Sequence, residues 1–222
     1  MNQLPDPVLI AAVLGSLALA PFLALMVTSY TKIAIVLGLL RMALGTQQVP
    51  SNMVLNGIAV IVSVFVMAPV GMEIAAAVQN SSFSKGTPRF QDYAKILEAG
   101  TQPVKTFLGQ HTGERERRIF MKTASQIWPE AQARSLSRDD LLVLIPSFTL
   151  SELTKAFQIG FLLYLAFVVI DMIVGNVLLA LGMMMISPTV VSVPIKLLLF
   201  VALDGWSHLV QGLMLSYRTA GG

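Results

Sequence analysis

A few charged and polar side chains stand inside long apolar runs of this 222-residue chain, and they are its most chemically informative residues. They are Asp171, Asn176, Lys196 and Asp204. A charge at the middle of a bilayer is costly unless it faces protein or water and has a partner. Such residues therefore mark either ion pairs that fix the register of helices or a pathway for protons or ions, and pairing is the simpler interpretation.

A group of methionines lies between two of these runs, Phe157 to Leu181 and Thr189 to Met214. Each run is long enough to enter or cross a bilayer, which takes about 20 apolar residues. Gly182 and Pro188 flank the group and favour a break in the helix, so the segment predicts a helical hairpin. Flexible, polarizable methionines at its tip can close an apolar constriction like a gasket, although an ordinary loop facing lipid or core is the alternative. The tip residues are Met183, Met184 and Met185.

Folding this hairpin about Met185 brings Asp171 and Lys196 to similar heights. Asp171 lies fourteen residues before Met185 and Lys196 eleven after it. The mismatch is roughly 4.5 Å at ~1.5 Å of rise per residue, which a lysine stem can span. We therefore expect an ion pair between the two arms. Asp204 lies two turns after Lys196 on nearly the same helix face and can instead meet a neighbouring subunit.

The residue patterns of catalytic and metal sites are missing. His111 and His208 stand alone, without metal-ligand spacing, and the chain has no cysteine. It also has no glycine-rich phosphate loop and no G-x-S-x-G nucleophile motif. The sequence therefore predicts a protein that is not an enzyme and holds neither metal nor cofactor.

The composition indicates a membrane or membrane-associated chain. Hydrophobic residues make up 55% and charged residues 12%, against about 25% charged in soluble domains, and the mean hydropathy is +0.73. The net charge of +3 is thinly spread, so nucleic acid is not expected as a partner. No basic residue precedes the apolar run from Val8, so a cleaved signal peptide is not expected.

The first expected region, residues 1–78, consists of hydrophobic helices. Val8 to Val27 is long enough for one span, kinked near Pro21. Ile33 to Leu40 is too short to cross alone, which indicates a re-entrant or interfacial helix or one packed on other protein. Met53 to Val78 is a second long run.

The second expected region, residues 79–148, is polar and predicts short amphipathic helices. The mixed-sign cluster from Glu114 to Arg118 indicates a solvated helix face rather than a site for an acidic partner. Breaks are expected at Gly86 to Pro88, Gly100 to Pro103, Gly109 to Gly113 and Trp128 to Pro129.

The third expected region, residues 149–222, is the hairpin with the methionine tip. Ser137 predicts a helix cap ahead of Leu141, and Pro146 is expected to end or kink that helix. Thr149 and Glu152 have the spacing of a capping box, so the long helix is expected to start there. The chain is thus predicted to be all-α and membrane-associated, built of helical hairpins with a small polar helical insertion.

Several motifs follow one another along the chain, each of them occurring once: Thr28 to Ile33, Leu39 to Asn56, Ser151 to Leu153, Ala156 to Phe161, Asp171, Gly182 to Met185, Pro188, Ser192 to Pro194, Lys196 to Phe200, and Asp204 to Trp206. In this order they resemble the FliP/SctR family, and the likeness covers most of the chain outside the polar segment. Tyr30 and Ser51 are minor departures, where the family more often has Phe and Pro.

The resemblance implies a core subunit of the bacterial type III secretion export apparatus, in the injectisome branch rather than the flagellar one. Members of the family form a pentameric ring with SctS-type and SctT-type subunits, through which unfolded protein substrates cross the inner membrane. The methionine loop seals the closed channel, which corresponds here to Met183, Met184 and Met185. The family places the polar segment on the periplasmic side, although its many basic residues would favour the cytoplasm.

The alternative function is a small ion-conducting or solute-transporting membrane protein that uses Asp171, Lys196 and Asp204 as its pathway. Secondary transporters usually show an internal repeat, and the two halves of this chain do not mirror one another. Oligomer mass and co-purifying partners would separate the two functions.

Overall fold

The computed structural model describes residues 24–80 and 90–218, together with residues 15, 18, 21 and 22, and these form helices without a strand. The all-α prediction is confirmed. The expected kink near Pro21 lies largely outside the described residues, as does the expected break at Gly86 to Pro88. The helices are α2 (Tyr30–Leu44), α3 (Asn52–Asn80), α4 (Phe90–His111), α5 (Glu114–Ile127), α6 (Glu130–Ser135), α7 (Leu141–Ala180), α8 (Pro188–Ala202) and α9 (Gly205–Leu215).

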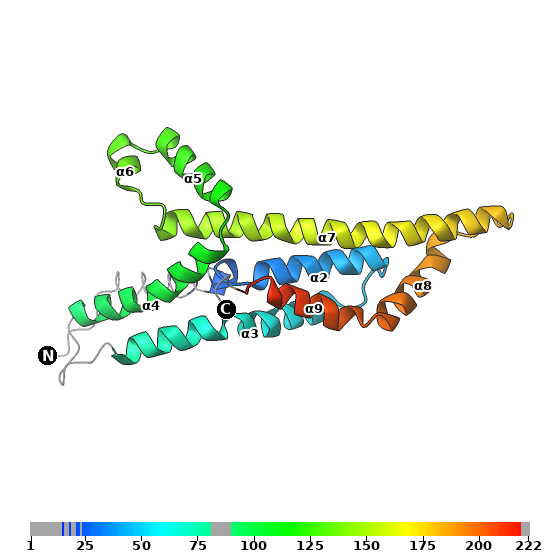
Figure 1. Ribbon diagram of the computed structural model, residues 1–222, viewed down its shortest axis with the longest axis horizontal. Coiled ribbons are helices and arrows are strands. Elements are labelled where there is room, and N and C mark those ends of the chain that lie inside the picture. The colour runs from blue at the N-terminus through cyan, green and yellow to red at the C-terminus, as the bar shows by residue number, and fades with distance from the viewer. Residues whose placement is uncertain (1–14, 16–17, 19–20, 23, 81–89, 219–222) are drawn as a thin grey trace.

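Helix α2 is the centre of the molecule. It lies between the long helix α7 and helix α3, and α9 packs beside it (Figure 1). Its inward residues Ile33, Val36 and Leu37 are completely buried. The short apolar run from Ile33 to Leu40, which cannot span a membrane alone, is therefore packed against this chain's own helices. Two glycines allow the close approach of its neighbours: a Cβ at Gly160 of α7 would lie 2.2 Å from Leu39, and one at Gly45 would lie 2.9 Å from Val193.

Helix α7 starts earlier than the capping-box spacing predicts. It begins at Leu141 after the N-cap residue Asp140 and runs for 40 residues, with Pro146 inside it. Ser137 is not the cap; its backbone N–H donates to Asp140. The helix continues through Pro146 because the surrounding turns bury Val143, Leu144 and Phe148, and this packing outweighs the one backbone hydrogen bond that proline removes. The prediction of a start at Thr149 was wrong.

The apolar run from Thr189 to Met214 forms two helices rather than one continuous helix. Helices α8 and α9 are bent by 64° relative to each other at Leu203 and Asp204, and Asp204 adopts a left-handed backbone with φ of 49°. Aspartate tolerates this conformation better than most residues. Gly205 then lets the chain pass close to Phe200, whose ring would lie 2.3 Å from an added Cβ.

The described part of the polar segment forms three helices, α4 to α6, of which α5 and α6 project from the start of α7 (Figure 1). Breaks between Gly109 and Gly113 and at Trp128 to Pro129 are confirmed. No break occurs at Gly100 to Pro103, because α4 runs through Pro103. Its later turns are held by packing of Phe107 and Leu108 against Phe148 and Leu144 of α7.

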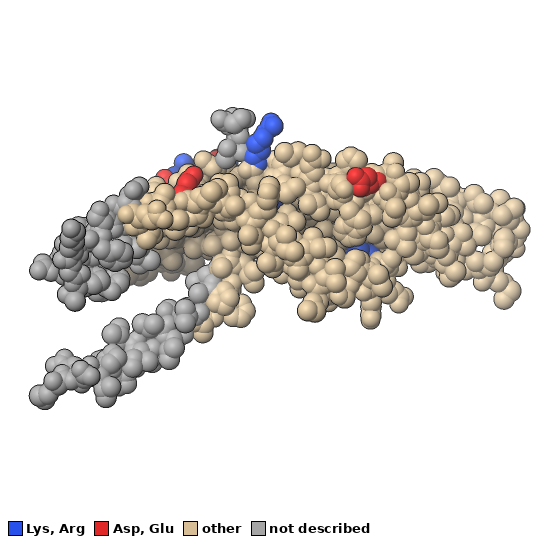
Figure 2. Space-filling model, turned by 90° about the horizontal axis from the view of Figure 1, so that it is seen from below, with Lys and Arg blue, Asp and Glu red and all other residues tan. Residues whose placement is uncertain are grey.

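Among the described residues, two helices are long and apolar enough to cross a membrane: residues 52–79 of α3 and the whole of α7. The bent pair of α8 and α9 makes a third candidate if it counts as one span. Only 28% of the most apolar stretch of α3 and 17% of that of α7 is buried within the chain. The face shown in Figure 2 accordingly carries few charged side chains over its length.

Candidate functional site

The turn between α7 and α8 presents the three predicted methionines. Helix α7 ends with a hydrogen-bond pattern that reverses the chain: the backbone N–H of Gly182 donates to Leu179 and that of Met183 donates to Leu178. Gly182 occupies the required left-handed position, with φ of 71°, which glycine adopts without strain. Ser187 precedes α8 and Pro188 opens it, because a first-turn proline needs no N–H partner. Backbone chemistry on both sides therefore fixes where the tip stands.

The methionines are progressively more exposed along the turn. Met183 is 41% exposed, Met184 79% and Met185 fully exposed. The tip forms the far end of the long α7 arm, away from the polar helices (Figure 1). Large apolar side chains with this much free surface are positioned to contact other molecules.

The structure joins Asp171 and Lys196 directly. Lys196 Nζ lies 2.6 Å from Asp171 Oδ2 and also donates to the carbonyl oxygen of Ala43 at 3.1 Å. Ala43 belongs to the last turn of α2, where a cation is favoured by the unpaired carbonyl groups. The side chain of Lys196 is 4% exposed and that of Asp171 40%. One lysine of α8 thus ties α8 to both α7 and α2.

The third predicted charge stands apart from this pair. Asp204 is exposed at the bend between α8 and α9, and its carboxylate accepts a hydrogen bond from the Ser207 hydroxyl at 2.9 Å. The bend removes the common helix face that the sequence spacing of Lys196 and Asp204 predicts. The structure therefore brings together two of the three residues and assigns Asp204 to the start of α9.

A second buried ion pair was missed by sequence reasoning. Lys32 of α2 and Glu152 of α7 are 1% and 0% exposed, and Lys32 Nζ lies 3.1 Å from Glu152 Oε2. The hydroxyl of Tyr217 donates to the same carboxylate oxygen, and Lys32 Nζ lies 3.5 Å from the centre of the Tyr217 ring. The available signal was the presence of Lys32 and Glu152 directly beside apolar runs, but the capping-box spacing from Thr149 gave Glu152 another explanation.

Two further groups surround this carboxylate. Lys155 Nζ lies 3.0 Å from Glu152 Oε1 and donates to the carbonyl oxygen of His111 at 2.7 Å. The His111 ring packs edge-on against Tyr217 at 5.2 Å between ring centres. Burial lowers the pKa of His111 below its usual value, and the nearby lysines lower it further against the opposing effect of Glu152. The last turn of α4 is thereby joined to the same cluster.

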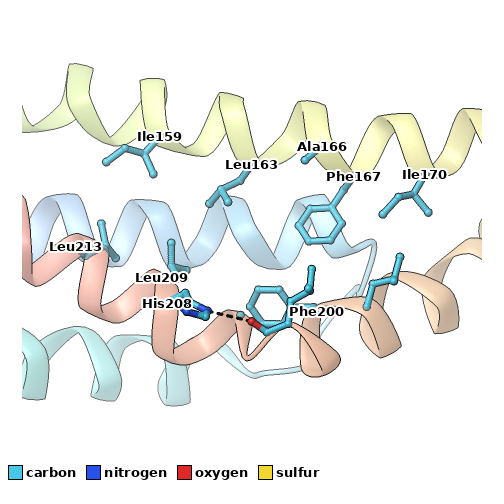
Figure 3. A pocket seen from close by; sticks show the side chains of 13 residues that line it. Ile159, Leu163, Ala166, Phe167, Ile170, Phe200, His208, Leu209 and Leu213 are labelled. Atoms are coloured by element: carbon cyan, nitrogen blue, oxygen red, sulfur yellow. Dashed lines mark hydrogen bonds between the residues drawn. The ribbon is translucent and has the colours of Figure 1, made fainter.

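An apolar groove runs between α7 and the bent pair α8 and α9, with a volume of about 640 Å³. Side chains from both sides point into it, among them Leu163, Phe167, Phe200 and Leu209 (Figure 3). His208 is its one ionisable lining residue, and its Nδ1 lies 3.0 Å from the carbonyl oxygen of Leu203. Within the residues that the structure describes, no three His, Cys, Asp or Glu side chains lie together as metal ligands do.

These features define an all-α, membrane-associated protein with a large exposed apolar surface. The chain belongs to the FliP family, whose family model matches residues 13–213. It is 56% identical over 203 residues to hypersensitivity response secretion protein HrcR of Ralstonia nicotianae, covering 91% of this chain and 94% of that protein. It is 47% identical over 217 residues to Yop proteins translocation protein R of Yersinia pestis, covering 98% and 99%.

A third relative is the surface presentation of antigens protein SpaP of Shigella flexneri, 44% identical over 220 residues and covering 97% and 98% of the two chains. All three relatives are proteins of the injectisome branch, in agreement with the resemblance seen in the motifs. The chain is therefore a component of a type III secretion apparatus, and its spanning-length helices agree with a membrane location.

Proposed function

We propose that this chain is a subunit of the export gate of a type III injectisome, in which several copies surround a channel for unfolded proteins. By the family resemblance the ring is pentameric and assembles with SctS-type and SctT-type subunits in the inner membrane. The polar helices α4 to α6 then lie on the periplasmic side, and the methionine tips meet at the channel axis.

The observation that carries this proposal is the exposure of apolar surface in one protomer. Met185 is fully exposed at the tip, and most of the apolar stretch of α7 is uncovered by this chain. Asp171, 40% exposed in the same helix, indicates that protein or water rather than lipid covers its side of α7, because a carboxylate facing lipid is costly. Neighbouring subunits provide such a covering.

The tip is suited to act as the seal. A methionine side chain has no branch and a polarizable sulfur, so several copies can fill an irregular constriction and rearrange when a chain passes. The hydrogen-bonded turn from Leu178 to Met183 fixes the base of the tip, while the side chains of Met184 and Met185 are 79% and 100% exposed. A rigid base with adaptable side chains is what a reversible gasket needs.

The alternative, an ion or solute pathway through the buried charges, has less support. A relay needs groups that can change partners, whereas Lys196 is held by both Asp171 and Ala43. Asp204 lies beyond the helix bend with its own hydrogen-bond partner. The pair therefore fits the role of fixing three helices in register.

Co-expression with the SctS-type and SctT-type subunits of the same apparatus tests the proposal. The mass of the purified particle, measured by native mass spectrometry, is expected to equal several copies of this 24.0 kDa chain plus the partners. The same chain expressed alone serves as the comparison. A particle with a single copy, or a lone protomer that transports solute in liposomes, would contradict the proposal.

A further inference from the structure

The second arm of the hairpin, which consists of α8, α9 and the residues up to Tyr217, contacts the rest of the molecule through polar groups near both of its ends. Near its start, Lys196 reaches Ala43 in the last turn of α2 and Asp171 of α7. At its end, the hydroxyl of Tyr217 lies 3.5 Å from the carbonyl oxygen of Ser29, directly before α2, and donates to Glu152 of α7. Both sets of contacts join the arm to the same two helices, at opposite ends of α2.

The contacts of Tyr217 are polar, and the residues that make them are buried. Tyr217 is 8% exposed, and Lys32 and Glu152 are almost completely buried. Burial and the adjacent carboxylate raise the pKa of the Tyr217 hydroxyl far above its usual value, so the group stays protonated and able to donate. A hydrogen bond to a buried charge contributes more than one between neutral groups.

Between these two points the arm is held by apolar packing, such as that of Leu209 and Leu213 against α2. The chain is bent by 64° at Asp204, and the groove beside the bend leaves space between α7 and the arm. Leu213 is the one residue of α9 that is buried. If the end of the arm were released, α8 and α9 could therefore shift about Lys196, and the tip attached to α8 would shift with them.

We propose that Tyr217 is a positioning residue of the gate: by fastening the end of the arm to Glu152, it holds the methionine tip in its closed position. This inference rests on the proposed gating function. It differs from a general contribution to stability, because loss of the Tyr217 hydroxyl is predicted to free the tip, whereas loss of apolar packing in the same cluster is predicted to lower stability alone.

The test uses the assembled complex carrying Met185→Cys, in a chain that has no other cysteine. The rate at which a water-soluble maleimide labels this thiol reports how freely the tip moves. Tyr217→Phe keeps the ring over Lys32 and removes only the hydroxyl. It is expected to raise the labelling rate about tenfold, the change that corresponds to losing one charge-assisted hydrogen bond.

The control is Phe148→Leu, which removes packing from the cluster that contains Phe107 and Tyr217 but touches none of the polar contacts. It is expected to lower the melting temperature without changing the labelling rate. Equal labelling rates in the parent, Tyr217→Phe and Phe148→Leu complexes would overturn the inference, as would equal increases in both variants.

Failure of the gating proposal gives a different result. Were the methionine tip not a seal, its replacement by alanine would leave the membrane tight, whatever Tyr217→Phe does to labelling. A leaking alanine variant together with an unchanged Tyr217→Phe complex would instead leave the seal in place and remove the role of Tyr217.

Discussion

Lys196 and Asp171 form an ion pair of 2.6 Å across the two arms that carry the methionine tip, and the lysine is the buried partner. Its ammonium group also reaches the end of α2 at Ala43. This relationship connects three helices at one point, close to where Gly45 and Val193 allow α2 and α8 to meet. The tip is therefore supported by a defined junction rather than by a free hairpin.

Breaking this pair is expected to be asymmetric. Asp171→Ala leaves a buried ammonium group with one carbonyl partner, whereas Lys196→Met leaves a carboxylate that is 40% exposed to solvent. We expect Asp171→Ala to cost about 1–2 kcal/mol and Lys196→Met less, because exposed charges are stabilised by water. Thermal unfolding of both variants and of the double variant measures this; a double variant that is no more stable than Asp171→Ala would contradict the pairing.

Shortening the tip is expected to open the closed channel. Replacing Met183, Met184 and Met185 with alanine removes the bulk that fills the constriction and keeps Gly182 and Pro188, which shape the turn. The assembly should form normally, and small-solute leakage should rise severalfold. Met172→Ala is the matched control, since Met172 is 63% exposed on α7 away from the turn. Growth in the presence of a normally excluded antibiotic reports the leak, and a tight alanine variant would count against the seal.

Two glycines of the α2 region are expected to respond in opposite ways to alanine. Gly45 has φ of 78° and its added Cβ would lie 2.9 Å from Val193 Cγ2, whereas Gly38 lies within α2 with open space around it. Gly45→Ala should therefore destabilise by about 1–3 kcal/mol. Gly38→Ala should stabilise by roughly 0.5–1 kcal/mol, because alanine favours the helix. The melting temperatures of the two variants test this prediction. Equal shifts in Gly45→Ala and Gly38→Ala would be inconsistent with this geometry.

Acidification is expected to weaken the junction of α4 with α7. Burial lowers the pKa of His111 in the folded protein, while the unfolded chain takes up this proton near pH 6.5. In the window below pH 6.5 the unfolded state binds more protons, so stability falls as the pH falls. The melting temperature should drop less steeply between pH 6.5 and pH 5 in His111→Gln than in the parent. Parallel curves for the two proteins would show that His111 does not titrate as described.

The positions of most helices could be predicted from the sequence, because apolar runs, glycines and prolines mark them directly. The pairing of Asp171 with Lys196 could also be predicted, by counting residues on either side of the hairpin tip. The tip residues were identifiable for the same reason, since Gly182 and Pro188 limit the helices on either side.

The features that sequence reasoning missed depend on contacts between distant residues. Pro146 and Pro103 lie inside helices because buried side chains on the neighbouring turns outweigh one lost backbone hydrogen bond. The bend at Asp204 comes from a left-handed residue that composition does not mark. Glu152 and Tyr217 are 65 residues apart, so no local spacing could join them.

The most direct test of the central claim is cross-linking between tips in the assembled complex. A single thiol introduced by Met185→Cys in a chain without cysteine should be joined to its copy in a neighbouring subunit by a short bifunctional maleimide. Met172→Cys, exposed on the shaft of α7, is the control. We predict cross-linked dimers at position 185 in the closed gate, the largest covalent species that one thiol per chain can give; uncross-linked protomers at this position, with cross-links at position 172 instead, would contradict the account.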